Sequence, residues 1–223
     1  MNTPVQWSCV LFDLDGTIAD SAAGITSTLA HTLETMGKPV PPPAELLAFV
    51  GPPIMDGFAA LGLNQSESQR ALRLYRARYA ERGAFDSAMF PGIEETVRTL
   101  HDTGVPIALA TSKPELQATR MLEHYGLADL FTFIGGASED ETRSEKADVI
   151  AYVLDNLRAE RVDLSSPVMV GDRVHDVEGA LANDLPVIFV QWGYGAEVEQ
   201  AGSIAAVASP SELLMLLLPE LAA

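Results

Sequence analysis

The stretch Cys9-Val10-Leu11-Phe12-Asp13-Leu14-Asp15-Gly16-Thr17 is a short apolar run that ends in two carboxylates, a glycine and a hydroxyl. An apolar run stopped by Asp-Gly predicts a buried strand followed by a tight turn, with Asp13 as the last residue of the strand. In a parallel sheet, ligands bind at the carboxyl ends of the strands. For this stretch alone, the alternative is a simple turn with Asp13 as a solvated flank.

Four more apolar runs follow, at residues 105–110, 131–134, 167–170 and 186–190, with helical patterns between them. This alternation predicts an α/β fold with a Rossmann-like parallel sheet and helices on both faces. Roughly 90 residues separate the first two runs, which is far more than one crossover helix needs. Helical patterns at 21–36, 44–49, 54–61 and 66–82 fill most of that gap. We therefore expect a core domain of residues 1–20 and 87–223, with a small helical cap domain inserted at 21–86.

The charge of the chain restricts its partners. A formal net charge of −17 and a pI near 4.4 argue against nucleic acid, whose binding requires a basic patch. No secretory signal or run of membrane-spanning length is present, and the single cysteine, Cys9, allows no intrachain disulfide. We expect a cytoplasmic protein, monomeric or homodimeric, that binds neither nucleic acid nor a membrane.

Polar side chains also follow two other expected strands. Because parallel strands end at the same edge of a sheet, residues far apart in the chain should converge there. These residues are Asp13, Asp15, Thr111, Asp172 and Asp176. Two carboxylates about 4 Å apart repel by about 4 kcal/mol at an effective dielectric of about 20, so the group needs a cation. An oxygen-rich site without cysteine or clustered histidine favours Mg²⁺ over zinc.

Lysine is rare in this chain, with only Lys38, Lys113 and Lys146 against eleven arginines. A small anionic substrate needs a locally basic site in such an acidic protein. Lys146 is expected at the start of a helix, where a cation is unfavourable for the helix dipole. A functional role for Lys146 is therefore favoured over an exposed charge at a helix end.

In chain order, Asp13-x-Asp15-Gly16-Thr17, Thr111-Ser112, Lys146 and Gly171-Asp172-x-x-x-Asp176 resemble the four motifs of the haloacid dehalogenase-like hydrolases. The resemblance covers essentially the whole chain. The helical insertion after the first motif is similar to the small helical (C1) cap of that superfamily. Gly51-Pro52-Pro53 and Trp192-Gly193-Tyr194-Gly195 resemble its phosphoglycolate phosphatase-like branch.

The resemblance implies a Mg²⁺-dependent phosphatase acting on a small phosphorylated metabolite. Asp13 would attack phosphorus to form an aspartyl-phosphate, and Asp15 would protonate the leaving group and then activate water. Thr111 and Lys146 would complete the catalytic group by holding phosphoryl oxygens. The metal would be held by Asp13, the backbone carbonyl of Asp15, Asp172 and Asp176, the last directly or through water. Substrate or phosphate contacts would come from Thr17, Ser112, Lys113, Gly51 and Pro52.

Substrate choice is expected to depend on the cap loop at residues 50–56. Relatives often carry an arginine where this chain has Met55, so a nucleoside or sugar leaving group fits an apolar loop at least as well as glycolate. Arg73, Arg76 and Arg78 on the expected cap helix are a further source of charge. Asp15 argues against dehalogenation. Two alternatives stay open: a β-phosphoglucomutase-like phosphotransferase and a non-catalytic homologue that binds phosphorylated ligands.

Overall fold

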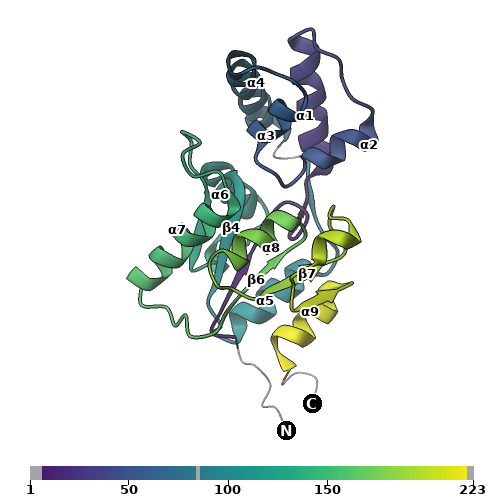
Figure 1. Cartoon of the computed structure of the whole chain (residues 1–223). Coiled ribbons are helices and arrows are strands. Elements are labelled where there is room, and N and C mark those ends of the chain that lie inside the picture. Colours follow the sequence, from purple (N-terminus) through teal and green to yellow (C-terminus); the bar gives the residue numbers. More distant parts are fainter. Residues whose placement is uncertain (1–6, 84–85, 220–223) are drawn as a thin grey trace.

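The computed structural model describes residues 7–83 and 86–219, and its centre is a parallel sheet of six strands in the order β5-β4-β1-β6-β7-β8 (Figure 1). The strands are β1 (Cys9–Phe12), β4 (Ile107–Pro114), β5 (Phe133–Ala137), β6 (Pro167–Gly171), β7 (Val187–Val190) and β8 (Ala205–Val207). From β1 the chain adds β4 and β5 on one side, and β6 to β8 on the other. The strand order therefore reverses beside β1, which is where parallel sheets bind ligands.

Helices cover both faces of this sheet, as expected. On one face, Val10 and Phe12 of β1 share a core with α5 (Ile93–Asp102), α6 (Glu115–His124) and α9 (Pro210–Leu217). On the other face, Cys9 and Leu11 pack with α7 (Lys146–Ala159) and α8 (Val174–Leu181). Because both faces are covered, all four residues of β1 are buried, which explains the unbroken apolar run in the sequence. The α/β prediction is confirmed.

A group of helices stands apart from the sheet, at the top of Figure 1. It comprises α1 (Ala22–Thr35), α2 (Pro43–Leu46), the 3₁₀ turn η1 (Leu47–Phe49), α3 (Ile54–Ala60), α4 (Gln65–Arg78) and the π-helical turn η2 (Tyr79–Gly83). Helix α4 begins at a capping box, in which Asn64 and Glu67 each accept a hydrogen bond from the other's backbone amide. We call this group the cap and the remainder the core. The exact boundaries predicted for two domains stay a prediction.

Two short strands connect the cap to the core side by side. The strands β2 (Ala19–Asp20) and β3 (Ala88–Met89) pair antiparallel, with Ala19 opposite Met89. Neither strand was expected, and neither was β8. The helix predicted to reach residue 82 ends at Arg78 and continues as η2.

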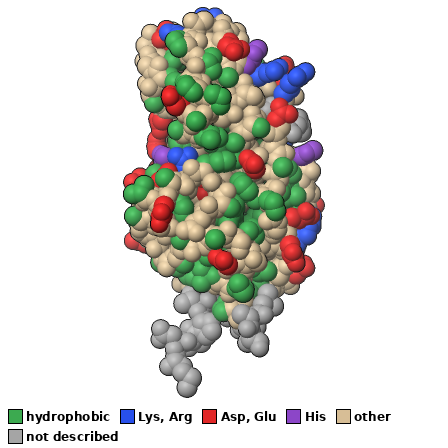
Figure 2. All heavy atoms as spheres, turned by 90° about the vertical axis from the view of Figure 1, so that its right-hand side faces the viewer, with side chains coloured by type: hydrophobic (Ala, Val, Ile, Leu, Met, Phe, Trp, Pro, Cys, Tyr) green, Lys and Arg blue, Asp and Glu red, His purple; other side chains and the backbone are tan. Residues whose placement is uncertain are grey.

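The core also contains the 3₁₀ turns η3 (Ala128–Leu130) and η4 (Glu197–Gln200). On the face drawn in Figure 2, acidic side chains are scattered over both the cap and the core, in line with the net charge of −17.

Candidate active site

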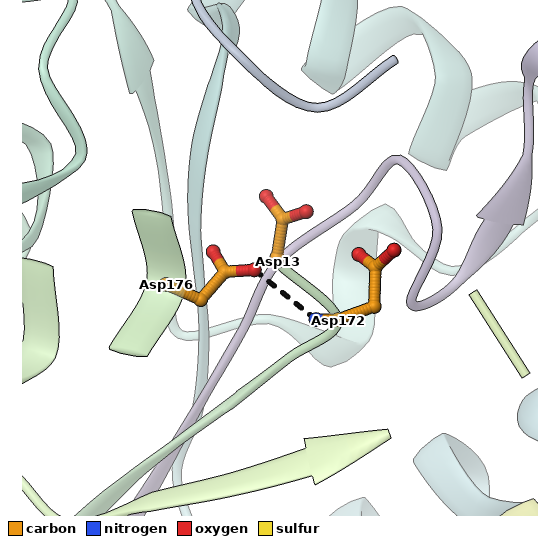
Figure 3. Close-up of side chains that lie close together, drawn as sticks. All are labelled: Asp13, Asp172 and Asp176. Carbon is orange, nitrogen blue, oxygen red and sulfur yellow. Dashed lines mark hydrogen bonds between the residues drawn. The ribbon is translucent and has the colours of Figure 1, made fainter. Parts of the chain in front are cut away.

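Three buried aspartates meet at the carboxyl ends of β1 and β6 (Figure 3). Asp13 follows β1, Asp172 follows β6, and Asp176 lies in the first turn of α8. One carboxylate oxygen of each lies within 4.8 Å of the others. The amide of Asp13 donates to the Val170 carbonyl at 2.9 Å, and the amide of Asp172 donates to Asp176 Oδ2 at 3.1 Å. The strand ends thus bring these residues together as the parallel topology predicts.

Lys146, the first residue of α7, places its ammonium group against two of these carboxylates. Its Nζ lies 2.6 Å from Asp13 Oδ1 and 2.7 Å from Asp176 Oδ1, and it donates to the Ala110 carbonyl at 3.1 Å. Although burial lowers the pKa of Lys146, the charges of Asp13 and Asp176 outweigh burial and raise that pKa above its ordinary value. Lys146 is therefore a buried cation inside an acidic cluster.

Asp15 has a different set of partners. Its carboxylate accepts from Ser21 Oγ at 2.5 Å and from Lys113 Nζ at 2.7 and 3.0 Å. The Lys113 ammonium also lies 4.7 Å from the centre of the Tyr79 ring, on the cap. Lys113 is expected to contact substrate or phosphate; in the structure it is paired with Asp15, and its contact with phosphate stays a prediction. The two aspartates of the first motif are thus held by two different lysines.

The electrostatics of the site suit a divalent cation. With all groups ionised, Asp13, Asp15, Asp172 and Asp176 outnumber Lys113 and Lys146 by two charges, and all six are buried. Burial raises the pKa of Asp13 to about 6 even though Lys146 opposes the shift. Burial, followed by the charges of Asp176 and Asp13, raises the pKa of Asp172 well above its usual range. A divalent cation would relieve this repulsion and favour the ionised carboxylates.

Glycines let the chain approach the aspartates closely enough for such a site. Gly16 has a left-handed φ of +97°, and a Cβ at either Gly16 or Gly193 would overlap Asp172 Oδ2. The donor set of Asp13, Asp172 and Asp176 consists of oxygen alone, which Mg²⁺ prefers. These residues therefore fit the cofactor that the sequence predicts. Participation of the Asp15 carbonyl stays a prediction.

The hydroxyl residues of the motifs are distributed over different contacts. Thr17 Oγ1 donates to Asp172 Oδ1 at 3.4 Å, so this side chain lies against a carboxylate of the site, and its contact with phosphate stays a prediction. Thr111 Oγ1 accepts from the Lys113 amide at 3.3 Å. Ser112 Oγ is buried without a hydrogen-bond partner among the described residues. Because Thr111 Oγ1 accepts and so keeps its own O–H to donate, and Ser112 Oγ has no partner, both of these hydroxyls are available to an anion among the described contacts.

A cleft between cap and core opens beside Asp15. Gly51 and Pro52 line it from the cap, together with residues of α4 and η2, and Ser112 and Lys113 line it from the core. Residues 51–54 of the expected specificity loop line the cleft, whereas Met55 and Asp56 do not. Arg76 of α4 also lines it, one of the three cap arginines named as a further source of charge.

Several contact residues carry no role in the sequence analysis. The amide of Tyr194 donates to Asp172 Oδ2 at 2.7 Å, and its hydroxyl donates to Asp20 Oδ1 of β2 at 2.7 Å. Arg173 donates through Nη1 to the Val50 carbonyl on the cap. Trp192 Nε1 donates to the Thr17 carbonyl at 3.0 Å. Two signals in the sequence point to these residues: the motif Trp192-Gly193-Tyr194-Gly195, and the position of Arg173 next to Asp172. Neither signal predicts which atoms these side chains contact.

These features define an α/β protein with an acidic, oxygen-rich site at the switch point of a parallel sheet and a helical cap over it. A family model described as "Haloacid dehalogenase-like hydrolase" matches residues 10–190, and the chain belongs to this family. The predicted family is thereby confirmed. Within the described ranges, no helix combines the length and apolar character needed to cross a membrane.

Similar proteins carry several different names. The "Tyrosine-protein kinase PtkA" of Mycobacterium tuberculosis is 45% identical over 188 residues, which are 83% of this chain and 62% of that protein. This chain thus spans somewhat less than two thirds of that relative. A "5'-nucleotidase" of Pseudomonas aeruginosa is 35% identical over 196 residues, or 87% of each chain. Further relatives are named phosphoglycolate phosphatase, in line with the predicted branch.

Among solved structures, "a predicted phosphatase from Clostridium acetobutylicum" superposes with a TM-score of 0.90 at 36% identity. The match covers 96% of this chain and 100% of that one. At that identity and coverage, the likeness extends to the cap as well as the core.

Proposed function

We propose that this chain is a Mg²⁺-dependent phosphatase that hydrolyses a small phosphomonoester through an aspartyl-phosphate. The observation that carries the proposal is the position of Asp13, whose carboxylate contacts Lys146 and lies beside Asp172 and Asp176 at the switch point of the sheet. Asp15, two residues further on, lines the cleft. A cytoplasmic location and a monomeric or homodimeric state belong to the same proposal.

Each side chain then has a distinct task. Asp13 attacks phosphorus, the bond from phosphorus to the leaving oxygen breaks, and Asp15 donates a proton to that oxygen. Water next attacks the aspartyl-phosphate while Asp15 accepts its proton, which releases phosphate and restores Asp13. Thr111, Ser112 and Lys146 bind the phosphoryl oxygens. Asp13, Asp172 and Asp176, the last directly or through water, would hold Mg²⁺, which would supply positive charge that lowers the repulsion between phosphate and carboxylates.

The test is hydrolysis of p-nitrophenyl phosphate by purified protein, with Mg²⁺ and with excess EDTA. We expect phosphate release that requires Mg²⁺ and that falls at least about 100-fold in Asp13→Asn, because the amide cannot act as the nucleophile. Asp102→Asn, the same change at an exposed position on α5, should leave the rate unchanged. Equal rates for wild type and Asp13→Asn, whether both zero or both measurable, would refute the proposal.

A second candidate function is transfer of the phosphoryl group to a hydroxyl other than water. The 45% identity to a protein named tyrosine-protein kinase favours it. In that reaction a phosphate donor would phosphorylate Asp13, and the acceptor hydroxyl would lose its proton to Asp15. Incubation with ATP labelled at the γ-phosphate and a tyrosine-containing peptide separates the two: labelled peptide supports transfer, and labelled inorganic phosphate supports hydrolysis. If activity requires a sugar bisphosphate activator, the chain is instead a β-phosphoglucomutase-like phosphotransferase.

A further inference from the structure

Every cation that lines the cleft, among the described residues, already has a carboxylate partner. Lys113 is paired with Asp15 at 2.7 Å. Arg76 is paired with Glu141 through Nη2, and its Nη1 lies 3.8 Å from Glu139 Oε2 and donates to the Glu139 carbonyl at 2.9 Å. The carboxylates of Asp15, Glu139 and Glu141 thus face these two cations. With all five groups ionised, the cleft carries one excess negative charge before any cofactor binds.

The partner of Arg76 is held in place by its own loop. Glu141 lies between β5 and α7 in a left-handed conformation, with φ of +61°, which is uncommon for a residue other than glycine. Next to it, Asp140 Oδ1 accepts from the Thr142 amide at 3.1 Å and from Ser138 Oγ at 2.6 Å. The amide of Ser138 donates to the Arg143 carbonyl at 2.9 Å and closes the loop. The Glu141 carboxylate is therefore presented to the cap by a hydrogen-bonded turn.

Much of the remaining cap lining is apolar or aromatic. The Tyr75 and Tyr79 rings are stacked with centroids 5.6 Å apart, and the lining continues through Phe49, Pro53 and Ile54. An uncharged leaving group gains free energy when its apolar surface is buried in such a cleft. A carboxylate on the leaving group would lose hydration without gaining an unpaired cation, and such burial is costly.

We infer that the ion pair of Arg76 with Glu141 makes the cleft selective for phosphomonoesters whose leaving group carries no negative charge. The inference rests on the phosphatase function proposed above. Among the described residues, Arg76 is the arginine that lines the cleft. Its Nη1 and Nη2 are paired with Glu139 and Glu141 while its Nε has no hydrogen-bond partner, so Glu141 offsets the charge of Arg76 toward the substrate. Glu141 is accordingly a specificity-determining residue, and removal of its charge should release Arg76 to bind an anionic leaving group.

Two esters of similar size, one with a charged and one with an uncharged leaving group, provide the test. Phosphoglycolate carries a carboxylate where 2-hydroxyethyl phosphate carries a hydroxymethyl group. We expect the kcat/KM of wild type to be at least tenfold higher for 2-hydroxyethyl phosphate. In Glu139→Gln/Glu141→Gln, which leaves Arg76 without either carboxylate, this ratio should shift at least tenfold toward phosphoglycolate. Adding Arg76→Met to that variant should cancel the shift, because the released cation is then absent.

A matched control uses the same substitution in a surface ion pair. Glu94 pairs with Arg98 at 2.9 Å on the exposed face of α5, so Glu94→Gln should leave the ratio unchanged. A wild type that prefers phosphoglycolate, or a glutamine double variant with the wild-type ratio, overturns the inference while leaving the phosphatase function intact. Absence of hydrolysis of both esters and of p-nitrophenyl phosphate overturns the proposed function, and the inference falls with it.

Discussion

At the scale of single residues, the three lysines of this chain differ in burial, and that difference distinguishes a lysine in a surface ion pair from lysines expected to act in the site. Each is paired with a carboxylate, but Lys113 and Lys146 are about 5% exposed, whereas the Lys38 side chain is 32% exposed beside Glu67. An exposed pair contributes about 0–1 kcal/mol, and a buried pair costs desolvation that its attraction does not always offset. Stability alone is therefore a weak reason to bury two lysines among four aspartates.

Replacing Lys146 tests that argument. We expect Lys146→Ala to lower turnover of p-nitrophenyl phosphate at least about tenfold, because the phosphoryl oxygens lose a positive charge in a site of low dielectric. Lys38→Ala removes a lysine from a partly exposed ion pair on the cap and should leave turnover unchanged. Initial rates at saturating substrate and Mg²⁺ provide the measurement. A near-normal rate in Lys146→Ala would assign this lysine to folding alone.

At the scale of elements, the turn η4 supports the end of β6 from outside the site. Glu199 Oε2 accepts from Arg173 Nε at 3.0 Å and from the Val174 amide at 2.9 Å, at the start of α8. Burial raises the pKa of Glu199, but these two donors and the Ala196 amide outweigh burial, so the pKa lies below its usual value. Arg173 in turn reaches the Val50 carbonyl on the cap. Glu199 thus links the acidic motif to the cap through one arginine.

Because this pKa is lowered on folding, ionised Glu199 stabilises the protein above the pKa of the unfolded chain, about 4.5, and the stabilisation is lost as the pH falls through the folded pKa. We expect Glu199→Gln to reduce the free energy of unfolding by about 1–2 kcal/mol at pH 7 and by less at pH 3.5. Urea unfolding at both pH values measures the difference. Glu197→Gln, an exposed neighbour in η4, should have little effect at either pH. A loss that does not change with pH would exclude a contribution from the charge.

Elements with a clear apolar run or helical periodicity were predictable from the sequence. Elements and contacts that form only when distant segments pack together were not. The apolar run of β1 and the helix at 93–102 carry a local signal, and the convergence of Asp13 with Asp172 follows from parallel topology. β2 and β3 have two residues each, too few to show a period. The contacts of Lys113 with Asp15 and of Arg76 with Glu141 join residues 98 and 65 positions apart. The first depends on how the ends of β1 and β4 meet within the core, and the second on how the cap packs against the core.

At the scale of the whole molecule, the net charge of −17 makes the folded chain repel itself. Added salt of any kind screens this repulsion, so a rise in thermal stability with NaCl carries no information about a site. The acidic cluster should respond to Mg²⁺ but not to NaCl. Asp13, Asp172 and Asp176 are buried, so dissolved salt screens their repulsion little, whereas a divalent cation bound between them would offset it. A comparison at equal ionic strength therefore isolates the contribution of the site.

We expect MgCl₂ to raise the melting temperature of wild type above that in NaCl of the same ionic strength. A ligand that binds only the folded state at tenfold its Kd adds about 1.4 kcal/mol to the free energy of unfolding. In Asp172→Asn this extra stabilisation should disappear, because one of the three converging carboxylates is lost. In EDTA the same variant should be at least as stable as wild type. Burial raises the pKa of the Asp172 carboxyl group, which means that its ionised form is costly in the folded protein, and the substitution removes that cost. Thermal unfolding followed by circular dichroism measures both effects. An equal Mg²⁺ increment in wild type and Asp172→Asn would place the cation elsewhere on this acidic surface, and the chemistry assigned to Asp13 would then lack its metal.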